Sequence, residues 1–373
     1  LIVGRFLGPD ALAAVGSLFT LMTFLTSILL GLCMGSSAVF SIRFGQKDFD
    51  GLKDSIFTSF LLIAAICAVL NLAAFLSIGW ILLLLKVPEE IQGLMRDYLM
   101  VIFSGITAVF LYNYFSCLLR AVGNSVIPLV FLAVSAVMNI GLDLWFVLGL
   151  KRGVAGATEA TVISQYVSGI GIAVYSWFAC PWLRIGREHC RIRLSCLKEI
   201  AGFSVLTCVQ QSVMNLGILM VQGLVNSFGT TVMAAFAVAV KIDSFAYMPV
   251  QDFGNAFSSF IAQNFGAGRK DRIHAGFRGA VLVSLLFCLI ISAVIWMFAR
   301  PLMLLFVNEQ ETAIIAEGIR YLHIEGAFYC GIGCLFLLYG LYRALGRPGM
   351  SVVLTVISLG TRVALAYILS SIP

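Results

Sequence analysis

The segment LLRAVGNSVIP at residues 118–128 recurs as LYRALGRPGMS at residues 341–351, 223 residues later. Two further pairs of segments keep nearly the same spacing. They are GPDALAAVG at 8–16 with GTTVMAAFA at 229–237, and SIRFGQKD at 41–48 with AQNFGAGR at 262–269. Self-similarity at a nearly fixed offset indicates a repeated structural unit. The sequence therefore predicts a chain built from two similar halves.

The composition around this repeat is that of a membrane protein. Of 373 residues, 61% are hydrophobic and 11% are charged, whereas soluble domains carry about 25% charged residues. A helix that crosses the bilayer needs roughly 20 predominantly apolar residues. Apolar stretches of this kind predict ten spans, at 11–40, 55–83, 93–117, 126–148, 154–178, 200–226, 233–262, 275–300, 312–340 and 350–370. Residues 1–7 are expected to be the outer end of a preceding span.

Every span is expected to be helical, because lipid offers the backbone no hydrogen-bond partner. The alternating pattern of a membrane β-barrel is absent. If the loops alternate between the two sides, one side collects most of the 24 lysines and arginines, including those of the basic loop at 181–199. The positive-inside rule places that side in the cytoplasm. The net charge of +6 is thus explained by topology, and no nucleic-acid partner is implied.

The basic loop near the middle of the chain predicts the domain boundaries. We expect an N-terminal lobe at 1–180, a cytoplasmic linker at 181–199 and a C-terminal lobe at 200–373. The matched segments fall on the same side of the membrane, so the repeat is parallel. The predicted fold is an all-α integral membrane protein of two pseudo-symmetric six-helix lobes. Two such lobes facing a central cavity are typical of alternating-access transporters.

Four motifs resemble one known family. They are GRFLGPDALAAVG at 4–16, MNIGLDLWFV at 138–147, GVAGATEATVISQ at 153–165 and AQNFGAGRKDR at 262–272. Together they resemble the multidrug and toxic compound extrusion (MATE) family over nearly the whole chain. The resemblance implies twelve helices and export of small organic compounds, often cationic, across the plasma membrane by antiport against Na⁺ or H⁺. This chain would then hold about ten complete helices and lack most of helix 1 and all of helix 12. We expect it to act as a monomer.

The most informative polar residue inside a predicted span is Asp143, six residues before Gly149 at the outer end of its helix. At 1.5 Å per residue, Asp143 lies about 9 Å inside the boundary. Asn139 lies one turn away on the same face. Thr161 lies eight residues into the next helix, at a depth of about 12 Å. Three oxygen-bearing side chains at similar depth predict a site for a monovalent cation or a proton. The alternative is that Asp143 bonds Asn139 and neighbouring helices in a structural role.

The resemblance implies the same site. In the MATE family an Asn and an Asp four residues apart in helix 5, with a Thr in helix 6, form a cation site, and they match Asn139, Asp143 and Thr161. The family's remaining ligand, an Asp in helix 1, would fall just before Leu1. Glu159 stands where the family pattern predicts a small apolar residue. It is either a second acid of this lobe or a solvated side chain near the outer mouth.

Polar residues in the spans of the second half are candidates for lining a substrate cavity. They are Gln210, Gln211, Lys241, Asp243, Tyr247, Gln251, Asp252 and Glu325. Lys241 and Asp243 are two residues apart on one helix, so they do not face each other. Either their charges are neutralised by groups on other helices, or the two side chains line the cavity. Pro249 can bend this helix. Arg362 is expected to form a pair or a cap.

No pattern in the sequence predicts an enzyme. There is no Walker loop, and the ten cysteines form no CxxC pair. We expect no cofactor apart from a coupling Na⁺ or H⁺. Two other classes of function compete with efflux. A flippase for lipid-linked precursors needs several cavity cations, and only Lys241 and Arg362 lie within spans. A structural or assembly protein leaves the membrane-embedded cluster of Asn139, Asp143 and Thr161 without a purpose.

Overall fold

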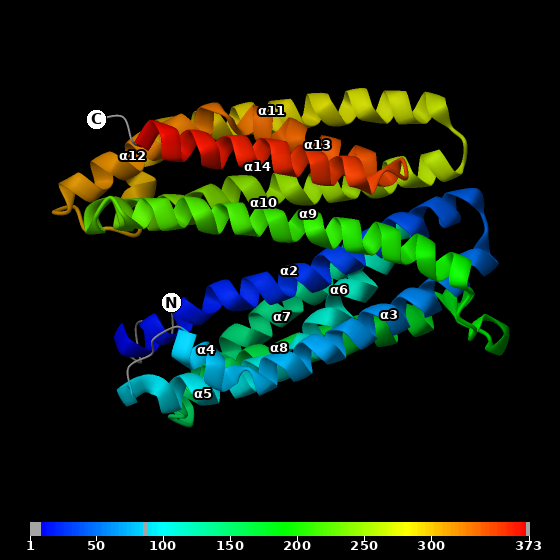
Figure 1. Ribbon diagram of the computed structural model, residues 1–373, viewed down its shortest axis with the longest axis horizontal. Helices are drawn as coiled ribbons and strands as arrows, with labels where there is room; N and C mark the ends of the chain where they lie inside the picture. Colours follow the sequence, from blue (N-terminus) through cyan, green and yellow to red (C-terminus); the bar gives the residue numbers. More distant parts are fainter. Residues whose placement is uncertain (1–8, 85–88, 371–373) are drawn as a thin grey trace. The chain divides into compact units, whose positions relative to one another are not determined.

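The computed structural model describes residues 9–84 and 89–370. The stub at 1–7 and the expected helix 1 aspartate lie outside the described residues. The regular elements of the described part are all helical (Figure 1). Nine of these helices are long and apolar enough to cross a membrane, or ten if one bent pair counts as a single span. The chain is therefore a multi-pass, all-α membrane protein, as the sequence predicts.

The chain divides into two compact units, Leu1–Cys208 and Val209–Pro373. The described helices of unit 1 are α2 (Pro9–Gln46), α3 (Phe49–Leu76), α4 (Ile78–Leu84), α5 (Glu89–Ser104), α6 (Ile106–Ala121), α7 (Val126–Leu144) with its π-helical end η1 (Trp145–Gly149), and α8 (Gly153–Ala179). Two 3-10 turns follow, η2 (Pro181–Leu183) and η3 (Arg187–His189). The helix α9 (Leu194–Asn226) contains the division. The sequence instead places the boundary in the loop at 181–199.

Unit 1 is held together by close helix packing around an aromatic core. Gly169 of α8 lies so near α6 that a Cβ there would come within 2.8 Å of the Ala108 carbonyl oxygen. Tyr114 of α6 is 1% exposed. Its hydroxyl donates to the Ile56 carbonyl at 2.7 Å and bonds the Ser59 hydroxyl at 2.8 Å. Because the buried Tyr114 hydroxyl has partners on α3, it carries no penalty for an unmade hydrogen bond.

Unit 2 is arranged around α10 (Thr230–Gly266). It also contains α11 (Lys270–Leu304), α12 (Thr312–Ala327), α13 (Tyr329–Ala344) and α14 (Pro348–Ser370). Figure 1 shows α10, α11, α13 and α14 running lengthwise beside one another. The crossing of α10 and α13 uses glycine on both helices. A Cβ on Gly340 would come within 2.6 Å of the Gly254 carbonyl oxygen, and a Cβ on Gly254 within 3.1 Å of the Phe336 carbonyl oxygen.

Both units contain a broken helix at matching places in the repeat. The predicted span 93–117 is interrupted at Gly105, between α5 and α6. The predicted span 312–340 is interrupted at Phe328, 223 residues later, where α12 and α13 meet at 51°. The sequence predicts unbroken helices in both places. Neither break contains a proline, and the shared offset indicates that the break belongs to the repeated unit.

The two prolines inside unit 2 helices behave differently from each other. The sequence allows a bend at Pro249, but α10 continues through it from Thr230 to Gly266. The kink lies in α11 at Phe298 (φ −111°, ψ 16°), three residues before Pro301. A proline ring clashes with the backbone of the preceding turn, and in α11 that turn departs from helical geometry.

Candidate functional site

The helices α7 and α8 bring the predicted cation ligands of unit 1 together. Asn139 Nδ2 of α7 donates to Thr161 Oγ1 of α8 at 3.3 Å. The Thr161 hydroxyl itself donates to the Ala157 carbonyl at 3.0 Å. Both side chains are half-buried. The short connection between the helices places them at equal depth, so that an amide and a hydroxyl meet inside a membrane span.

Asp143 lies one helical turn beyond Asn139. Its Oδ1 is buried and has no hydrogen-bond partner among the described residues. A buried carboxylate oxygen without a partner is costly in any protein interior. Two residues later α7 changes into the π-helical turn η1, and such turns occur frequently at functional sites. The cluster of Asn139, Asp143 and Thr161 therefore offers a buried acceptor to a small cation or a proton.

Glu159 takes part in a different interaction. Its Oε2 lies 2.5 Å from Nη1 of Arg152, and the two side chains are 24% and 51% exposed. The sequence left two possibilities open, a second acid or a solvated side chain. In the structure Glu159 is an ion-paired acid near the start of α8, so its charge is offset by a neighbour from the adjacent loop.

Unit 2 contains a cavity of about 600 Å³. This volume falls within the range of about 300–1,000 Å³ for small-molecule sites. Three of the eight residues predicted to line a substrate cavity do so, namely Asp243, Tyr247 and Glu325. Arg362 also lines it, and its Nη2 lies 3.6 Å from Glu325 Oε1. The pairing expected for Arg362 is thus present, inside the cavity wall.

The other five candidates do not line this cavity. Lys241 and Asp252 are exposed, Gln251 is half-buried, and Gln210 and Gln211 are buried. For Lys241 and Asp252 the cause is helical periodicity. Lys241 and Asp252 are two and nine residues from Asp243, so both point about half a turn away from it. Gln210 lies one turn before Met214, the first residue of α9 in the lining.

The cavity also has tyrosines that the sequence analysis missed, Tyr321 on α12 and Tyr339 on α13. Tyr321 stands four residues before Glu325, on the same helical face, so this spacing could have indicated it. No spacing in the sequence indicates Tyr339, because only the packing of α13 against the other helices brings it to the cavity. Asp243, Glu325 and Tyr329 lie within electrostatic reach of one another.

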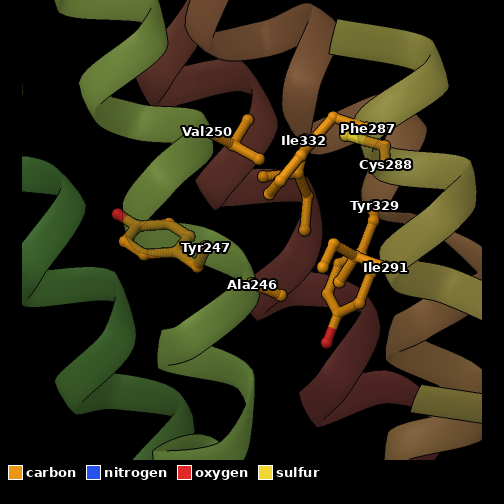
Figure 2. A pocket seen from close by; sticks show the side chains of 8 residues that line it. All are labelled: Ala246, Tyr247, Val250, Phe287, Cys288, Ile291, Tyr329 and Ile332. Atoms are coloured by element: carbon orange, nitrogen blue, oxygen red, sulfur yellow. The ribbon is translucent and has the colours of Figure 1, made fainter. Parts of the chain in front are cut away.

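Figure 2 shows the packed interior beside this cavity. Tyr247 points away from the other labelled side chains, and its hydroxyl donates to the Met214 sulfur at 3.7 Å. The space among Ala246, Cys288 and Ile332 is only about 10 Å³, at the lower limit for a single water. The interior pocket is therefore a small packing gap, and Tyr247 belongs to the wall of the larger cavity.

The MatE family profile matches residues 1–145 and 205–368. The chain belongs to the MATE family. It is 31% identical over 362 residues to a probable multidrug resistance protein of Bacillus subtilis, YpnP, covering 95% of this chain and 79% of that protein. A second B. subtilis relative, YoeA, is 29% identical over 99% of this chain and 81% of its own length.

Solved structures have the same fold. A MOP superfamily transporter from Pyrococcus furiosus superposes with a TM-score of 0.92 at 22% identity, over 98% of this chain and 82% of that one. A MATE family transporter in an outward-facing conformation gives the same TM-score, identity and coverage. The two-lobe helical fold predicted from the repeat is therefore the fold of the MATE structures.

Proposed function

We propose that this chain is a secondary multidrug efflux transporter that exports organic cations in exchange for Na⁺ or H⁺. Its relatives include proteins named for multidrug resistance and export. The observation that carries the coupling mechanism is the unpartnered, buried Oδ1 of Asp143 beside the bonded pair Asn139 and Thr161. A carboxylate in this position can hold a proton, or hold Na⁺ with the amide and hydroxyl oxygens as further ligands. Glu159 is a possible accessory acid, with its ion pair to Arg152 as the competing role.

The cavity of unit 2 is the proposed substrate site. Asp243 and Glu325 supply two negative charges against the one positive charge of Arg362. Tyr247, Tyr321 and Tyr339 supply aromatic faces, which attract cations through their quadrupoles. A flippase for pyrophosphate-linked lipids is not favoured, because the only basic residue in the lining, Arg362, is paired with an acid. In alternating access, both sites would open first to one side of the membrane and then to the other.

The experiment is efflux of an organic cation such as ethidium from liposomes that contain the complete protein. A Na⁺ gradient and a pH gradient are imposed separately, which also identifies the coupling ion. We expect Asp143→Asn to abolish gradient-driven efflux and Asp271→Asn, which changes an exposed carboxylate in the first turn of α11, to preserve it. Wild-type efflux by Asp143→Asn under both gradients would show that the site assignment is wrong.

We further propose that the chain resides in the plasma membrane with the segment 181–199 in the cytoplasm. Cys190 is exposed and Cys196 is buried. An impermeant thiol reagent should therefore label Cys190 in inverted vesicles and leave it unlabelled in intact cells. The control is Cys190→Ser, which should remove that labelling. Labelling of Cys190 from outside intact cells would reverse the orientation.

A further inference from the structure

A further cavity lies in unit 1, toward the opposite ends of the helices from Asp143. Its volume is about 190 Å³. The lining comes from α3, α6, the last turns of α8, the end of η2 and the two residues that follow it. It consists of Ile56, Phe57, Phe60, Tyr114, Phe115, Leu118, Ala173, Ser176, Trp177, Leu183, Arg184 and Ile185. All three helices contribute residues near the end that faces the basic loop, so the cavity lies close to that boundary of the membrane.

The wall of this cavity consists mainly of apolar side chains, and its hydroxyl groups already have hydrogen-bond partners. The two hydroxyls in it are already used, Tyr114 by Ser59 and Ile56, and Ser176 by the Ile172 carbonyl at 2.7 Å. An apolar cavity of about 150 Å³ stays free of water and binds a molecule the size of benzene. Apart from Arg184, a cavity of this size and lining therefore accepts hydrocarbon and offers no free hydrogen-bonding group to a polar ligand.

Arg184 stands at the rim of this cavity. Its Nε donates to the Trp177 carbonyl at 2.9 Å, and its guanidinium lies 5.8 Å from the centre of the Trp177 ring. No ion pair of Arg184 occurs among the described residues. Two other arginines of unit 1 differ, since Arg43 pairs with Glu199 at 2.5 Å and Arg193 with Asp54 at 2.9 Å. Arg184 is thus a fixed cation whose two terminal nitrogens remain available to an anion.

We propose that this cavity binds an acidic phospholipid, with part of an acyl chain among Phe57, Phe60 and Trp177 and the headgroup phosphate on Arg184. The combination of a hydrocarbon slot and a guanidinium without an ion pair among the described residues matches the two ends of such a lipid. Arginine presents a fork of donors suited to phosphate oxygens. An organic cation is a poor occupant, because Arg184 would repel it at the rim.

The test uses the fluorescence of Trp177 in the complete protein. A variant that keeps Trp177 and replaces Trp80, Trp145, Trp182 and Trp296 by Phe is reconstituted with lipids brominated on the acyl chain. Brominated phosphatidylglycerol should quench Trp177 at lower mole fraction than brominated phosphatidylcholine. A basic residue near the surface favours an acidic lipid by about fivefold, so Arg184→Gln should remove a preference of that size. Arg272→Gln, an exposed basic residue of unit 2, should leave the preference unchanged.

A second variant fills the cavity and leaves the charge in place. Ala173→Phe should reduce quenching by both lipids, whereas Val174→Phe, exposed on the same helix, should not. If the variant with one tryptophan does not fold, native mass spectrometry of the unmodified protein and of Arg184→Gln measures retained phosphatidylglycerol directly. Quenching or retention that depends on neither headgroup nor Arg184 would overturn the proposal. So would relief of quenching by tetraphenylphosphonium to the same extent for both lipids, which would identify the cavity as a drug site.

Discussion

The two units place their membrane-embedded acids in different surroundings. In unit 1, Asp143 stands beside one amide and one hydroxyl that already bond each other at 3.3 Å. In unit 2, Asp243 and Glu325 face a cavity of about 600 Å³ with tyrosines and Arg362. The first arrangement fits a small ion, and the second has room for an organic molecule. The two units of the repeat thus carry two different arrangements of polar side chains.

The repeat shows how the difference arose at particular residues. In the register of the 118–128 and 341–351 segments, Asn139 corresponds to Arg362 and Asp143 to Ala366. A guanidinium therefore stands where unit 1 has the Asn139 amide, and an alanine stands where unit 1 has the Asp143 carboxylate. The breaks at Gly105 and Phe328 keep the same register. The positions of the helix breaks are shared between the units, whereas the polar side chains are not.

The variant with the largest expected effect, Asp143→Asn, distinguishes the proposed ion site from the proposed drug site. Asp143→Asn should lose all gradient-driven efflux and yet bind ethidium with unchanged affinity, because the proposed drug site lies in unit 2. Equilibrium binding to purified protein, measured by ethidium fluorescence, checks the second half of this prediction. A large loss of ethidium affinity in Asp143→Asn would mean that the two sites are one.

Removing a charge from the unit 2 cavity should weaken binding of cationic drugs. Glu325→Gln and Asp243→Asn should each raise the Kd of a monovalent organic cation about tenfold, which corresponds to about 1.4 kcal/mol. A neutral compound of similar shape should bind as before. Arg362→Gln is the matched control and should act in the opposite direction, since it frees Glu325. Equal losses for charged and neutral compounds would indicate a disturbed fold instead of a lost charge.

Thr161→Ala should have a smaller effect than Asp143→Asn, because it removes one neutral ligand. A typical hydrogen bond contributes about 1 kcal/mol, so we expect about a fivefold rise in the coupling-ion concentration that gives half-maximal efflux. Thr161→Ser retains the hydroxyl and should restore most of the affinity. A loss as complete as that of Asp143→Asn would give Thr161 a different role.

Glu159→Gln should change least. Ion pairs exposed to solvent contribute about 0–1 kcal/mol, and Arg152 is half-exposed. Efflux should stay within about twofold of wild type, and a thermal-shift assay should show a small decrease in stability. Arg152→Gln serves as the partner variant and should behave alike. Loss of coupling in Glu159→Gln but not in Arg152→Gln would show that Glu159 takes part in transport.

Local information in the sequence was sufficient for the spans and for the meeting of Asn139 with Thr161. Hydropathy sets the helices, and a short loop between antiparallel helices fixes which turns lie at equal depth. The role of these residues in coupling remains a prediction. The lining of the unit 2 cavity was harder to predict from the sequence, since its wall combines α9, α10, α12, α13 and α14. The rotation of each helix decides which of its residues face the cavity. Lys241 and Asp252 do not line this cavity for that reason. The helix breaks at Gly105 and Phe328 contain no proline to indicate them, whereas the kink at Phe298 has a sequence signal in Pro301.

The central claim is that the coupling ion binds at Asp143, and ion binding without transport tests it most directly. Purified complete protein is titrated with radioactive Na⁺, and proton uptake is followed with a pH indicator in the same preparation. The account predicts that Asp143→Asn loses the bound ion, whichever it is, and that Asp243→Asn retains it. Retention of the ion by Asp143→Asn together with its loss from Asp243→Asn would contradict the account and move the coupling site to unit 2.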